Sequence, residues 1–411
     1  MTDNRILVGR DPLVRVLLPE QDVENPDVTI LVPTLNEERT VSMFMDWCIE
    51  GIAKSGLKVE VLIADSSTDK TPEIALSKGA RVVQAPKRGL GRAYIDSIPF
   101  VRGKFIIMGD ADCTYDFREI RPFYDAYMAG AEFVMGSRFK GKIDDNAMPP
   151  LHRYFGTPLT TFILNFIFGS RFSDIHCGMR GISTDALHRM KLRSQGWEYA
   201  SEMVLKSVHM KLRTTEVPIH FHKDPDGRLS HMKRRGPLEP WRAGWANLIA
   251  MFVYGVDFFL GRPGMVLFGL GLALLVTLLG GPVTIGTVRL STNSMLAGLG
   301  MAVLGLSMLF SAGLARILFD YTGTVGWRYQ QRFSHNRVVS FCLAAGVAAM
   351  AGLYPLVRDF LHYGALPDGV GVETNWAIFA IWLIIAAFQT FIFALMVRAM
   401  RLMLPPADSE P

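Results

Sequence analysis

Four long apolar stretches near the C-terminus constrain the fold of this sequence more than any other feature. They span residues 264–288, 290–315, 338–357 and 374–397, and none of them contains Asp, Glu, Lys or Arg. Each reaches the roughly 20 residues that an α-helix needs to cross the hydrocarbon core of a bilayer. We therefore predict four transmembrane helices, in a membrane domain at residues 263–400.

The distribution of arginine predicts how these helices are oriented, because cytoplasmic membrane loops carry an excess of Lys and Arg. The second loop and the C-terminal segment contain Arg316, Arg328, Arg332, Arg337, Arg398 and Arg401, whereas the first and third loops contain only Arg289 and Arg358. The N-terminal residues lack the apolar core of a signal peptide. We expect a multi-pass protein of the cell (inner) membrane, with the preceding domain and both termini in the cytoplasm.

The charge balance and the cysteines argue against some classes of protein. The net charge of +5 comes partly from this arginine bias and partly from a basic strip, Lys233, Arg234, Arg235 and Arg242. Such a strip suits an anionic lipid surface. No nucleic-acid motif accompanies it, so we expect a bilayer partner and no nucleic acid. The four cysteines show no CxxC spacing, which predicts free thiols.

The residues before the membrane domain alternate between two kinds of segment. Short apolar runs lie at residues 28–34, 59–65, 81–86 and 104–112, and segments of helical spacing lie between them at 36–56, 69–79 and 89–103. This alternation predicts an α/β domain with a mostly parallel sheet and covering helices. Ligands bind such sheets at the carboxyl ends of the strands, so the polar clusters at 33–37, 65–69 and 110–112 should converge on one cleft.

The predicted domains follow from these patterns. A long loop and a helix follow residue 138, a helix covers 198–210 and a strand covers 213–223. An aromatic-rich amphipathic segment at 237–262 should lie at the membrane interface, with Trp241, Trp245, Leu248, Ile249 and Phe252 on one face. The α/β domain then covers residues 27–236, after an N-terminal extension at 1–26, and a cytoplasmic tail covers 401–411.

Two aspartates at the end of the fourth predicted strand, Asp110 and Asp112, stand one residue apart. Two such carboxylates about 4 Å apart repel each other by roughly 4 kcal/mol at an effective dielectric of about 20. A cation would relieve this repulsion, and Mg²⁺ is commonly held by one or two carboxylates with water and phosphate oxygens completing its shell. Such an ion would bridge the protein to a nucleotide diphosphate and neutralise the leaving group. On these three letters alone, an ordinary surface turn after a strand is the more common interpretation.

Other strand-end residues fit the same donor. Glu37 and Asp65 could take ribose hydroxyls and a base edge, and Lys87 and Arg88 lie in a loop that could face phosphates. The alternating histidines His220 and His222, with His231, could suggest zinc, but on a probable strand they favour an ordinary polar surface.

Seven ordered segments resemble the glycosyltransferase family 2 enzymes that make polyprenyl-phosphate sugars, a group that includes dolichyl-phosphate mannose and glucose synthases. The segments are VPTLNEE, LIADSSTDKT, KRGLGRAY, MGDADCTYDF, VMGSRF, DIHCGMRG and SEMVLKS. The resemblance covers residues 27–262, and its PDGRLSHMK and WRAGW segments are shared with bacterial and archaeal relatives. It implies a GT-A domain, a Rossmann-like fold that binds nucleotide sugars, followed by membrane helices.

The resemblance implies roles on the donor side. Asp110 and Asp112 match the DxD motif that binds Mg²⁺ or Mn²⁺. Glu37 and Asp65 match contacts to the donor nucleotide, and Pro33 shapes the loop that touches the base. Relatives with glutamine as a further metal contact have it where this chain has Thr114, which leaves the third metal ligand open.

The resemblance also implies an acceptor site. Arg138 matches an arginine near the phosphates, and Arg153 with Thr157 resembles the pair that holds the lipid phosphate. Arg228 or the nearby Lys233 would complete this anion site. Asp112, Arg138, Arg153 and Arg228 are then the residues that we expect to carry catalysis, by positioning and by charge stabilisation.

The implied reaction is transfer of a hexose from UDP-glucose or GDP-mannose to a dolichyl- or undecaprenyl-type phosphate in the bilayer. The acceptor phosphate is already ionised at neutral pH, so no strong general base is required, and one in-line displacement gives a β-linked product. The sequence leaves open the sugar nucleotide, the polyprenol length and whether the chain forms a homo-oligomer.

Two other readings stay open. A processive polysaccharide synthase uses the same donor fold beside membrane helices, but its QxxRW pattern finds only QQRF at residues 330–333. A non-catalytic scaffold or transporter would normally carry ionisable residues inside the membrane, and the four stretches contain no acidic or basic ones.

Overall fold

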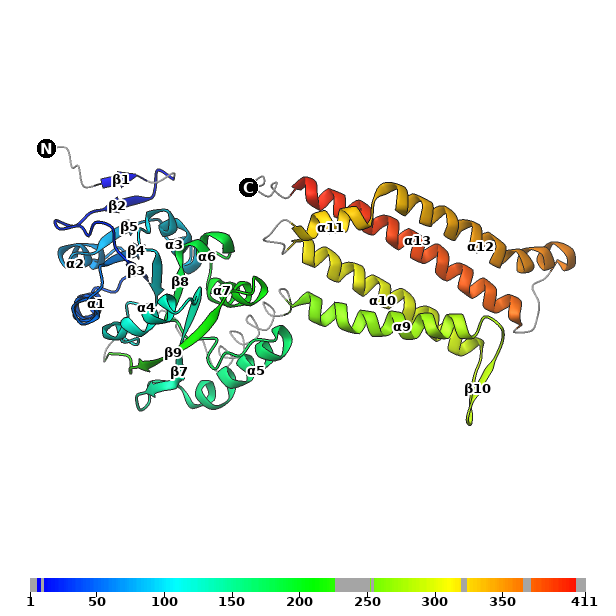
Figure 1. The fold of residues 1–411 in the computed structure, drawn as a ribbon, viewed down its shortest axis with the longest axis horizontal. Coiled ribbons are helices and arrows are strands. Elements are labelled where there is room, and N and C mark those ends of the chain that lie inside the picture. The colour runs from blue at the N-terminus through cyan, green and yellow to red at the C-terminus, as the bar shows by residue number, and fades with distance from the viewer. Residues whose placement is uncertain are drawn as a thin grey trace. The chain divides into compact units, whose positions relative to one another are not determined.

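The computed structural model describes residues 6–8, 11–225, 252, 255–318, 324–364 and 371–403. Two compact units divide the chain, the first Met1–Met251 and the second Phe252–Pro411. The first is the predicted α/β unit and the second is the predicted helical membrane unit (Figure 1). Arg228, Lys233, His231 and most of the interfacial segment at 237–262 lie outside the described residues.

A nine-stranded mixed sheet forms the centre of the α/β unit, in the order β1-β2-β5-β4-β3-β6-β8-β7-β9. The strands are β1 (Ile6–Val8), β2 (Arg15–Leu17), β3 (Val28–Thr34), β4 (Val59–Asp65), β5 (Arg81–Gln84), β6 (Phe105–Met108), β7 (Phe133–Ile143), β8 (Arg180–Ser183) and β9 (Thr214–Phe221). Strands β5, β4, β3 and β6 run parallel, as predicted. The flanks depart from the prediction of a mostly parallel sheet, because β2 and β8 pair antiparallel with their neighbours.

Helices connect and cover these strands. They are α1 (Val41–Ser55), α2 (Thr71–Ser77), α3 (Leu90–Ser97), α4 (Arg121–Met128), α5 (Thr157–Phe168), α6 (Thr184–Met190) and α7 (Glu198–His209). Short 3-10 turns lie at Ile98–Phe100 and Phe117–Glu119, and a π-helical turn at His152–Gly156 precedes α5. The central strands are buried on both faces, since β4 exposes none of its residues, which is typical of parallel strands between two layers of helices.

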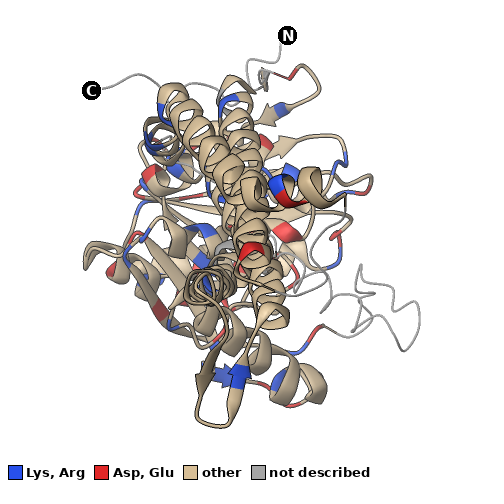
Figure 2. Ribbon diagram, turned by 90° about the vertical axis from the view of Figure 1, so that its right-hand side faces the viewer, with Lys and Arg blue, Asp and Glu red and all other residues tan. Residues whose placement is uncertain are grey.

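The four predicted transmembrane helices are confirmed as helices long and apolar enough to cross a membrane, at Phe258–Thr277, Thr292–Leu318, His335–Tyr363 and Val372–Met400. They correspond to α9 (Arg262–Thr277) with the π-helical turn Asp257–Gly261 before it, α10 (Thr292–Leu318), α12 (His335–Tyr363) and α13 (Val372–Met403). A short helix, α11 (Thr324–Arg332), lies between α10 and α12. Charged side chains are sparse along the long helices (Figure 2).

The first span differs from its predicted bounds. The helix ends at Thr277 rather than continuing through residue 288, and β10 (Val283–Ile285) and β11 (Val288–Leu290) form an antiparallel hairpin instead. Gly280, Gly281 and Pro282 explain the break, because proline has no backbone N–H to continue the helix and glycine favours turns. Apolar composition alone did not distinguish this hairpin from a helix.

The glycine at position 51 in α1 permits the closest approach between this helix and the turn that follows the Asp110–Asp112 loop. A Cβ atom at Gly51 would lie far inside van der Waals contact with the backbone carbonyl oxygen of Phe117. Both partners are backbone, so neither can rotate away as a flexible side chain would.

We predict that Gly51→Ala destabilises the α/β unit by about 1–3 kcal/mol, because overpacking forces the backbone to shift. At an open helical site the same change would stabilise by roughly 1 kcal/mol, so the sign of the effect is diagnostic. Chemical denaturation of the full chain in detergent, followed by near-ultraviolet circular dichroism, would measure it. Lys54→Ala on the exposed part of α1 is the control, and a stabilising Gly51→Ala would contradict the packing described.

Candidate active site

The parallel register of β3, β4 and β6 brings the predicted donor residues to one edge of the sheet. Strands β3 and β4 pair in register up to Thr34 opposite Asp65, and β6 pairs with the other side of β3. The loops that follow these three strands therefore leave the sheet at the same edge. Direct bonds join the first two loops, since the Thr34 hydroxyl donates to Asp65 Oδ1 at 2.8 Å and the Glu37 N–H donates to Thr71 Oγ1 at 2.9 Å.

The two carboxylates predicted to contact the nucleotide are held in place by neighbours. Asp65 is 2% exposed and also accepts a hydrogen bond from the Ser67 N–H at 3.2 Å. Burial raises the pKa of Asp65, although its hydrogen bonds oppose that shift. Glu37 is buried and accepts from the Thr40 hydroxyl at 2.9 Å. Pro33, half-buried near the end of β3, lies opposite Ala64.

Asp110 and Asp112 follow β6 and are both half-buried. The backbone turns sharply between them and Thr114, because Cys113 adopts a left-handed conformation with φ of 60°, which is uncommon for a residue other than glycine. Thr114 donates to Asp112 Oδ1 twice, from its N–H at 3.0 Å and from its hydroxyl at 2.6 Å. The Thr114 hydroxyl therefore orients Asp112. The family resemblance implied no such role for Thr114, since it only marked the position where some relatives have a metal-binding glutamine.

The space beside Asp110 depends on a glycine. A Cβ atom at Gly178 would come within 2.8 Å of Asp110 Oδ2 and equally close to the Tyr115 ring. The Gly178 N–H also donates to the Tyr115 hydroxyl oxygen at 2.7 Å. The carboxylate oxygens of Asp110 and Asp112 are hard donors of the kind that Mg²⁺ and Mn²⁺ prefer, so the residues fit such an ion.

A hydrogen-bonded network of histidines and carboxylates fixes the far end of this loop. His222 contacts Asp116 Oδ2 through Nε2 at 3.2 Å and Asp144 Oδ2 through Nδ1 at 2.9 Å. His220 Nε2 contacts the other oxygen of Asp144 at 2.7 Å. The backbone N–H of His222 donates to the Thr114 carbonyl oxygen at 2.8 Å. This network, which we call the Asp116–His222 tie, joins the loop after Asp112 to the ends of β7 and β9.

Arg118 keeps Asp116, the central carboxylate of this tie, in its ionised form. Its guanidinium donates to both oxygens of Asp116, at 2.8 and 2.7 Å, and lies 4.5 Å above the Trp47 ring. Burial alone would raise the pKa of Asp116, but hydrogen bonds from Arg118 and His222 outweigh it and lower the pKa to about 2.

Zinc binding by this cluster is geometrically conceivable but is not what the contacts favour. Within the described part of the chain, Asp116, His220 and His222 form a group whose ligand atoms lie within 4.8 Å of one another. Both oxygens of Asp116 are already engaged by Arg118. The contacts therefore favour a partly buried polar network at these histidines, where the sequence predicted an ordinary polar surface.

The predicted phosphate-facing residues lie in the loop after β5. Lys87 is exposed. Arg88 is half-exposed and donates to Asp11 Oδ2 at 2.6 Å. Asp11 belongs to the N-terminal extension, whose strands β1 and β2 join the sheet beside β5. No local sequence pattern predicts the ion pair between Arg88 and Asp11, because the two residues stand far apart in the chain and are brought together by the sheet order.

Arg138 lies inside the α/β unit. It forms a two-pronged ion pair with Asp174, with Nε to Oδ2 at 2.7 Å and Nη2 to Oδ1 at 2.8 Å, and its guanidinium lies 5.2 Å above the Phe221 ring. Burial works against its charge, but the hydrogen bonds that Arg138 donates to Asp174 raise the pKa of Arg138, so it stays protonated. Asp174, in the DIHC segment, is the functional neighbour that sequence reasoning missed.

The predicted lipid-phosphate residues lie at the start of α5. Arg153, in the π-helical turn, is half-exposed with its guanidinium 5.5 Å from the Tyr154 ring centre. Thr157 is the buried first residue of α5. Among the described residues, Arg153 makes no hydrogen bond or ion pair with Arg138 or Asp174. The helix is instead tied to the DIHC segment by His176, whose Nε2 lies 2.8 Å from Thr160 Oγ1.

Comparison with known proteins identifies the family. The family model described as glycosyl transferase family 2 matches residues 29–190. The low-salt glycan biosynthesis hexosyltransferase Agl6 of Haloferax volcanii is 37% identical over 301 residues, which cover 73% of this chain and 69% of that relative. The chain belongs to glycosyl transferase family 2. It is therefore a glycosyltransferase, and its α/β unit is the GT-A-like domain that the resemblance implied.

Other relatives of this family 2 enzyme are more distant. A dolichyl-phosphate hexose transferase of Haloferax volcanii is 28% identical over 199 residues, covering 48% of this chain and 83% of the relative. A dolichyl-phosphate beta-glucosyltransferase of Saccharomyces cerevisiae is 23% identical over 231 residues, covering 49% and 69%. Among solved structures, glucosyl-3-phosphoglycerate synthase from Mycobacterium tuberculosis, in complex with Mn²⁺, UDP and its product, has a TM-score of 0.42 and 19% identity, covering 56% of this chain and 80% of that one.

We predict that Asp116→Asn destabilises the α/β unit at neutral pH and that this difference shrinks in acid. The pKa of Asp116 is lower in the folded chain, about 2, than the roughly 3.9 of an unfolded aspartate. The stabilisation by its charge, about 2 kcal/mol, is therefore present above about pH 4 and is lost as the pH falls through about 2. Denaturation midpoints of the wild type and the variant at pH 6, 4 and 2.5 would measure the difference in their stability.

Asp125→Asn is the matched control for this experiment, because Asp125 is an exposed carboxylate on α4 that pairs with Arg121 at the surface. Surface substitutions of this kind change stability by less than about 0.5 kcal/mol. A gap between Asp116→Asn and the wild type that stays constant down to pH 2.5 would mean that Asp116 does not depend on its charge.

Proposed function

We propose that this enzyme transfers a hexose from a nucleotide sugar, UDP-glucose or GDP-mannose, to the phosphate of a membrane polyprenol such as dolichyl phosphate. The observation that carries this proposal is the pair Asp110 and Asp112 at the strand end of a family 2 domain, in a chain with four helices able to cross a membrane. Relatives named for dolichyl-phosphate hexose and glucose transfer support the acceptor class.

The donor would bind over the edge where β3, β4 and β6 end. Glu37, Asp65 and Pro33 would contact the base and ribose, and Lys87 and Arg88 would face the diphosphate. Asp110 and Asp112 would hold Mg²⁺ or Mn²⁺, which when bound neutralises the charge that develops on the departing nucleotide diphosphate. Thr114 supports this role by orienting Asp112 through two hydrogen bonds.

The acceptor phosphate needs orientation rather than deprotonation. Arg153 and Thr157, at the start of α5, would bind its oxygens, together with Arg228 or Lys233. Arg138 would add positive charge from inside the domain, kept protonated and fixed in direction by Asp174. An acceptor oxygen held in line with the anomeric carbon attacks as the diphosphate leaves, which inverts the configuration and gives a β-linked polyprenyl-phosphate hexose.

The lipid explains why a glycosyltransferase carries membrane helices. Each buried CH₂ group contributes about 0.8 kcal/mol, so a polyprenyl chain stays in the bilayer and its phosphate must be met at the surface. The arginine-rich second loop and C-terminal segment support a surface on the cytoplasmic side of the cell membrane, where nucleotide sugars are made.

We predict that membranes containing the enzyme, given Mg²⁺, polyprenyl phosphate and a panel of nucleotide sugars, form one lipid whose mass increases by a single hexose. Mass spectrometry of the extracted lipid would identify the donor, and the anomeric coupling constant in a proton NMR spectrum would show a β linkage. A chelator should stop the reaction and added Mg²⁺ or Mn²⁺ should restore it. An α-linked product would exclude the in-line mechanism, and a long polymer would favour a processive synthase.

We also predict that Asp112→Asn lowers kcat by about 100-fold or more. The substitution removes one of the two carboxylates proposed to hold the ion that stabilises the charge on the leaving diphosphate. The carboxamide keeps the size of the side chain and can still accept from Thr114, so folding should be retained. Asp46→Asn, an exposed carboxylate on α1 that pairs with Lys78, is the control and should keep wild-type turnover. Unchanged turnover in Asp112→Asn would refute the assignment of the metal-binding pair.

A further inference from the structure

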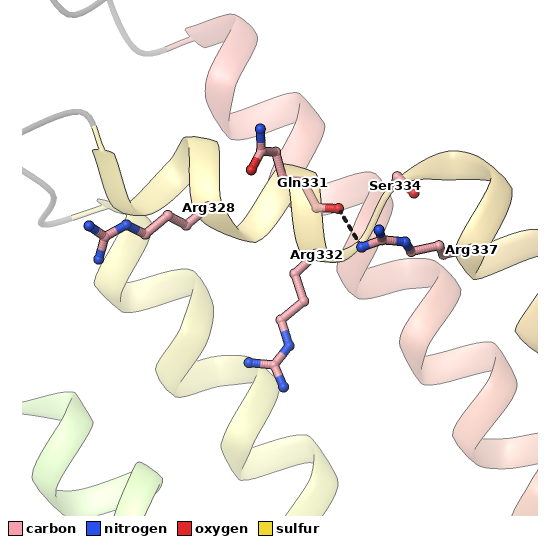
Figure 3. A pocket seen from close by; sticks show the side chains of 5 residues that line it. All are labelled: Arg328, Gln331, Arg332, Ser334 and Arg337. Atoms are coloured by element: carbon pink, nitrogen blue, oxygen red, sulfur yellow. Dashed lines mark hydrogen bonds between the residues drawn. The ribbon is translucent and has the colours of Figure 1, made fainter.

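A cavity in the membrane unit gathers three arginines from the segment between the second and third spans. Its volume is about 640 Å³, and its lining residues are Arg328, Gln331, Arg332, Ser334 and Arg337. The first three belong to α11, and the last two stand at the start of α12 (Figure 3). None of the described residues that line it is acidic.

An apolar face holds α11 against the spans. Val325, Tyr329 and Phe333 follow one another at intervals of four residues and therefore lie on one face of the helix. That face packs against a buried cluster that includes Ile317 of α10 and Phe393 of α13. Arg328 and Gln331 lie away from this face, whereas Arg332 follows Val325 by seven residues and lies at its edge.

Arg337 brings a third cation to the same place from the neighbouring helix. Its Nη1 donates to the backbone carbonyl oxygen of Gln331 at 3.3 Å, so the side chain turns back from α12 toward α11 (Figure 3). The excess of arginine in cytoplasmic loops accounts for how many arginines this segment carries. It does not account for three of them lining one cavity, where like charges repel, although their guanidinium groups point in different directions (Figure 3).

The location of the cavity indicates which anion it can meet. Helix α10 ends at Leu318 and α12 begins at His335, and both are candidate spans. Helix α11 therefore lies at the level where membrane helices end, which is the level of lipid headgroups. Arginine is the side chain best suited to a phosphate, because its planar guanidinium can donate two parallel hydrogen bonds to phosphate oxygens.

We propose that this cavity binds the phosphate headgroup of a membrane lipid whose chains lie along α10, α12 and α13. Basic pockets between transmembrane helices on the cytoplasmic side recognise phosphate-bearing lipids in this way. The shared chemistry is a phosphate ester, which an anionic phospholipid, a polyprenyl phosphate or free inorganic phosphate would all supply. None of its lining residues is among those proposed for transfer, and the proposal does not depend on the identity of the donor or acceptor.

The test uses the full chain purified into nanodiscs of phosphatidylcholine, with and without phosphatidylglycerol, and native mass spectrometry of the lipids retained. The variant Arg328→Gln/Arg332→Gln should retain phosphatidylglycerol at least tenfold less than the wild type, since each arginine near a membrane surface contributes to anionic-lipid binding. Arg289→Gln/Arg358→Gln removes the same charge from the other loops and should retain as much as the wild type. Equal retention by these two variants would overturn the proposal.

Two further arms separate the sources of phosphate and control for insertion. Polyprenyl phosphate retained in place of phosphatidylglycerol would support the site and name its lipid, whereas displacement of both by millimolar inorganic phosphate would refute a lipid site. Arg328→Lys/Arg332→Lys keeps the loop charge that sets orientation but loses the two-pronged geometry, and it should bind with intermediate strength. Hexose transfer measured in neutral detergent should be unchanged in both double variants, which separates a failure here from a failure of the proposed reaction.

Discussion

The parallel register of β3 with β4 and β6 is the constraint on which the rest of the α/β unit depends. Because the strands run in the same direction, the polar residues that follow each of them must leave the sheet at one edge. Thr34 and Asp65 stand directly opposite each other and share a hydrogen bond of 2.8 Å. A slip of one residue in this pairing would turn their side chains to opposite faces. The burial of β4 along its whole length makes such a slip costly, so the hydrophobic core also fixes the geometry of the donor side.

The sheet brings these loops close to one another, and charged groups inside the unit then hold them in place. The Asp116–His222 tie holds the end of the loop that starts at Asp110, and Arg118 keeps Asp116 ionised by binding both of its oxygens. Asp174 keeps Arg138 ionised in the same way, through a buried two-pronged ion pair. Breaking a buried pair leaves an uncompensated charge, which is far more costly than the pair itself is stabilising. These pairs therefore restrict the loops to one arrangement, which is what a reaction that relies on positioning requires.

The sequence predicted the elements that carry a local signal and missed those that depend on distant partners. Strands β3 and β4 have their predicted bounds, because each is a largely apolar run that ends in a polar residue. Strand β8, with the sequence RGIS, has no such signal and exists because β6 and β7 lie on either side of it. The site shows the same division. The DxD pair was assigned from its place at the end of an apolar run and from the family resemblance. The contacts of Asp116 with His222 and of Arg88 with Asp11 instead span 106 and 77 residues, and the chain between them gives no local indication that they meet.

The membrane unit shows that one set of residues can satisfy two physical requirements. Arginines in the second loop favour its retention in the cytoplasm, and this requirement depends on their number rather than on their arrangement. Their arrangement is set by α11, whose apolar face is held against α10 and α13 through Tyr329, Phe333 and Phe393. A loop without this helix would keep the same charge but could spread it, as repulsion between like charges favours. The packing of three aromatic rings therefore holds α11 in one position and keeps Arg328 and Arg332 beside Arg337.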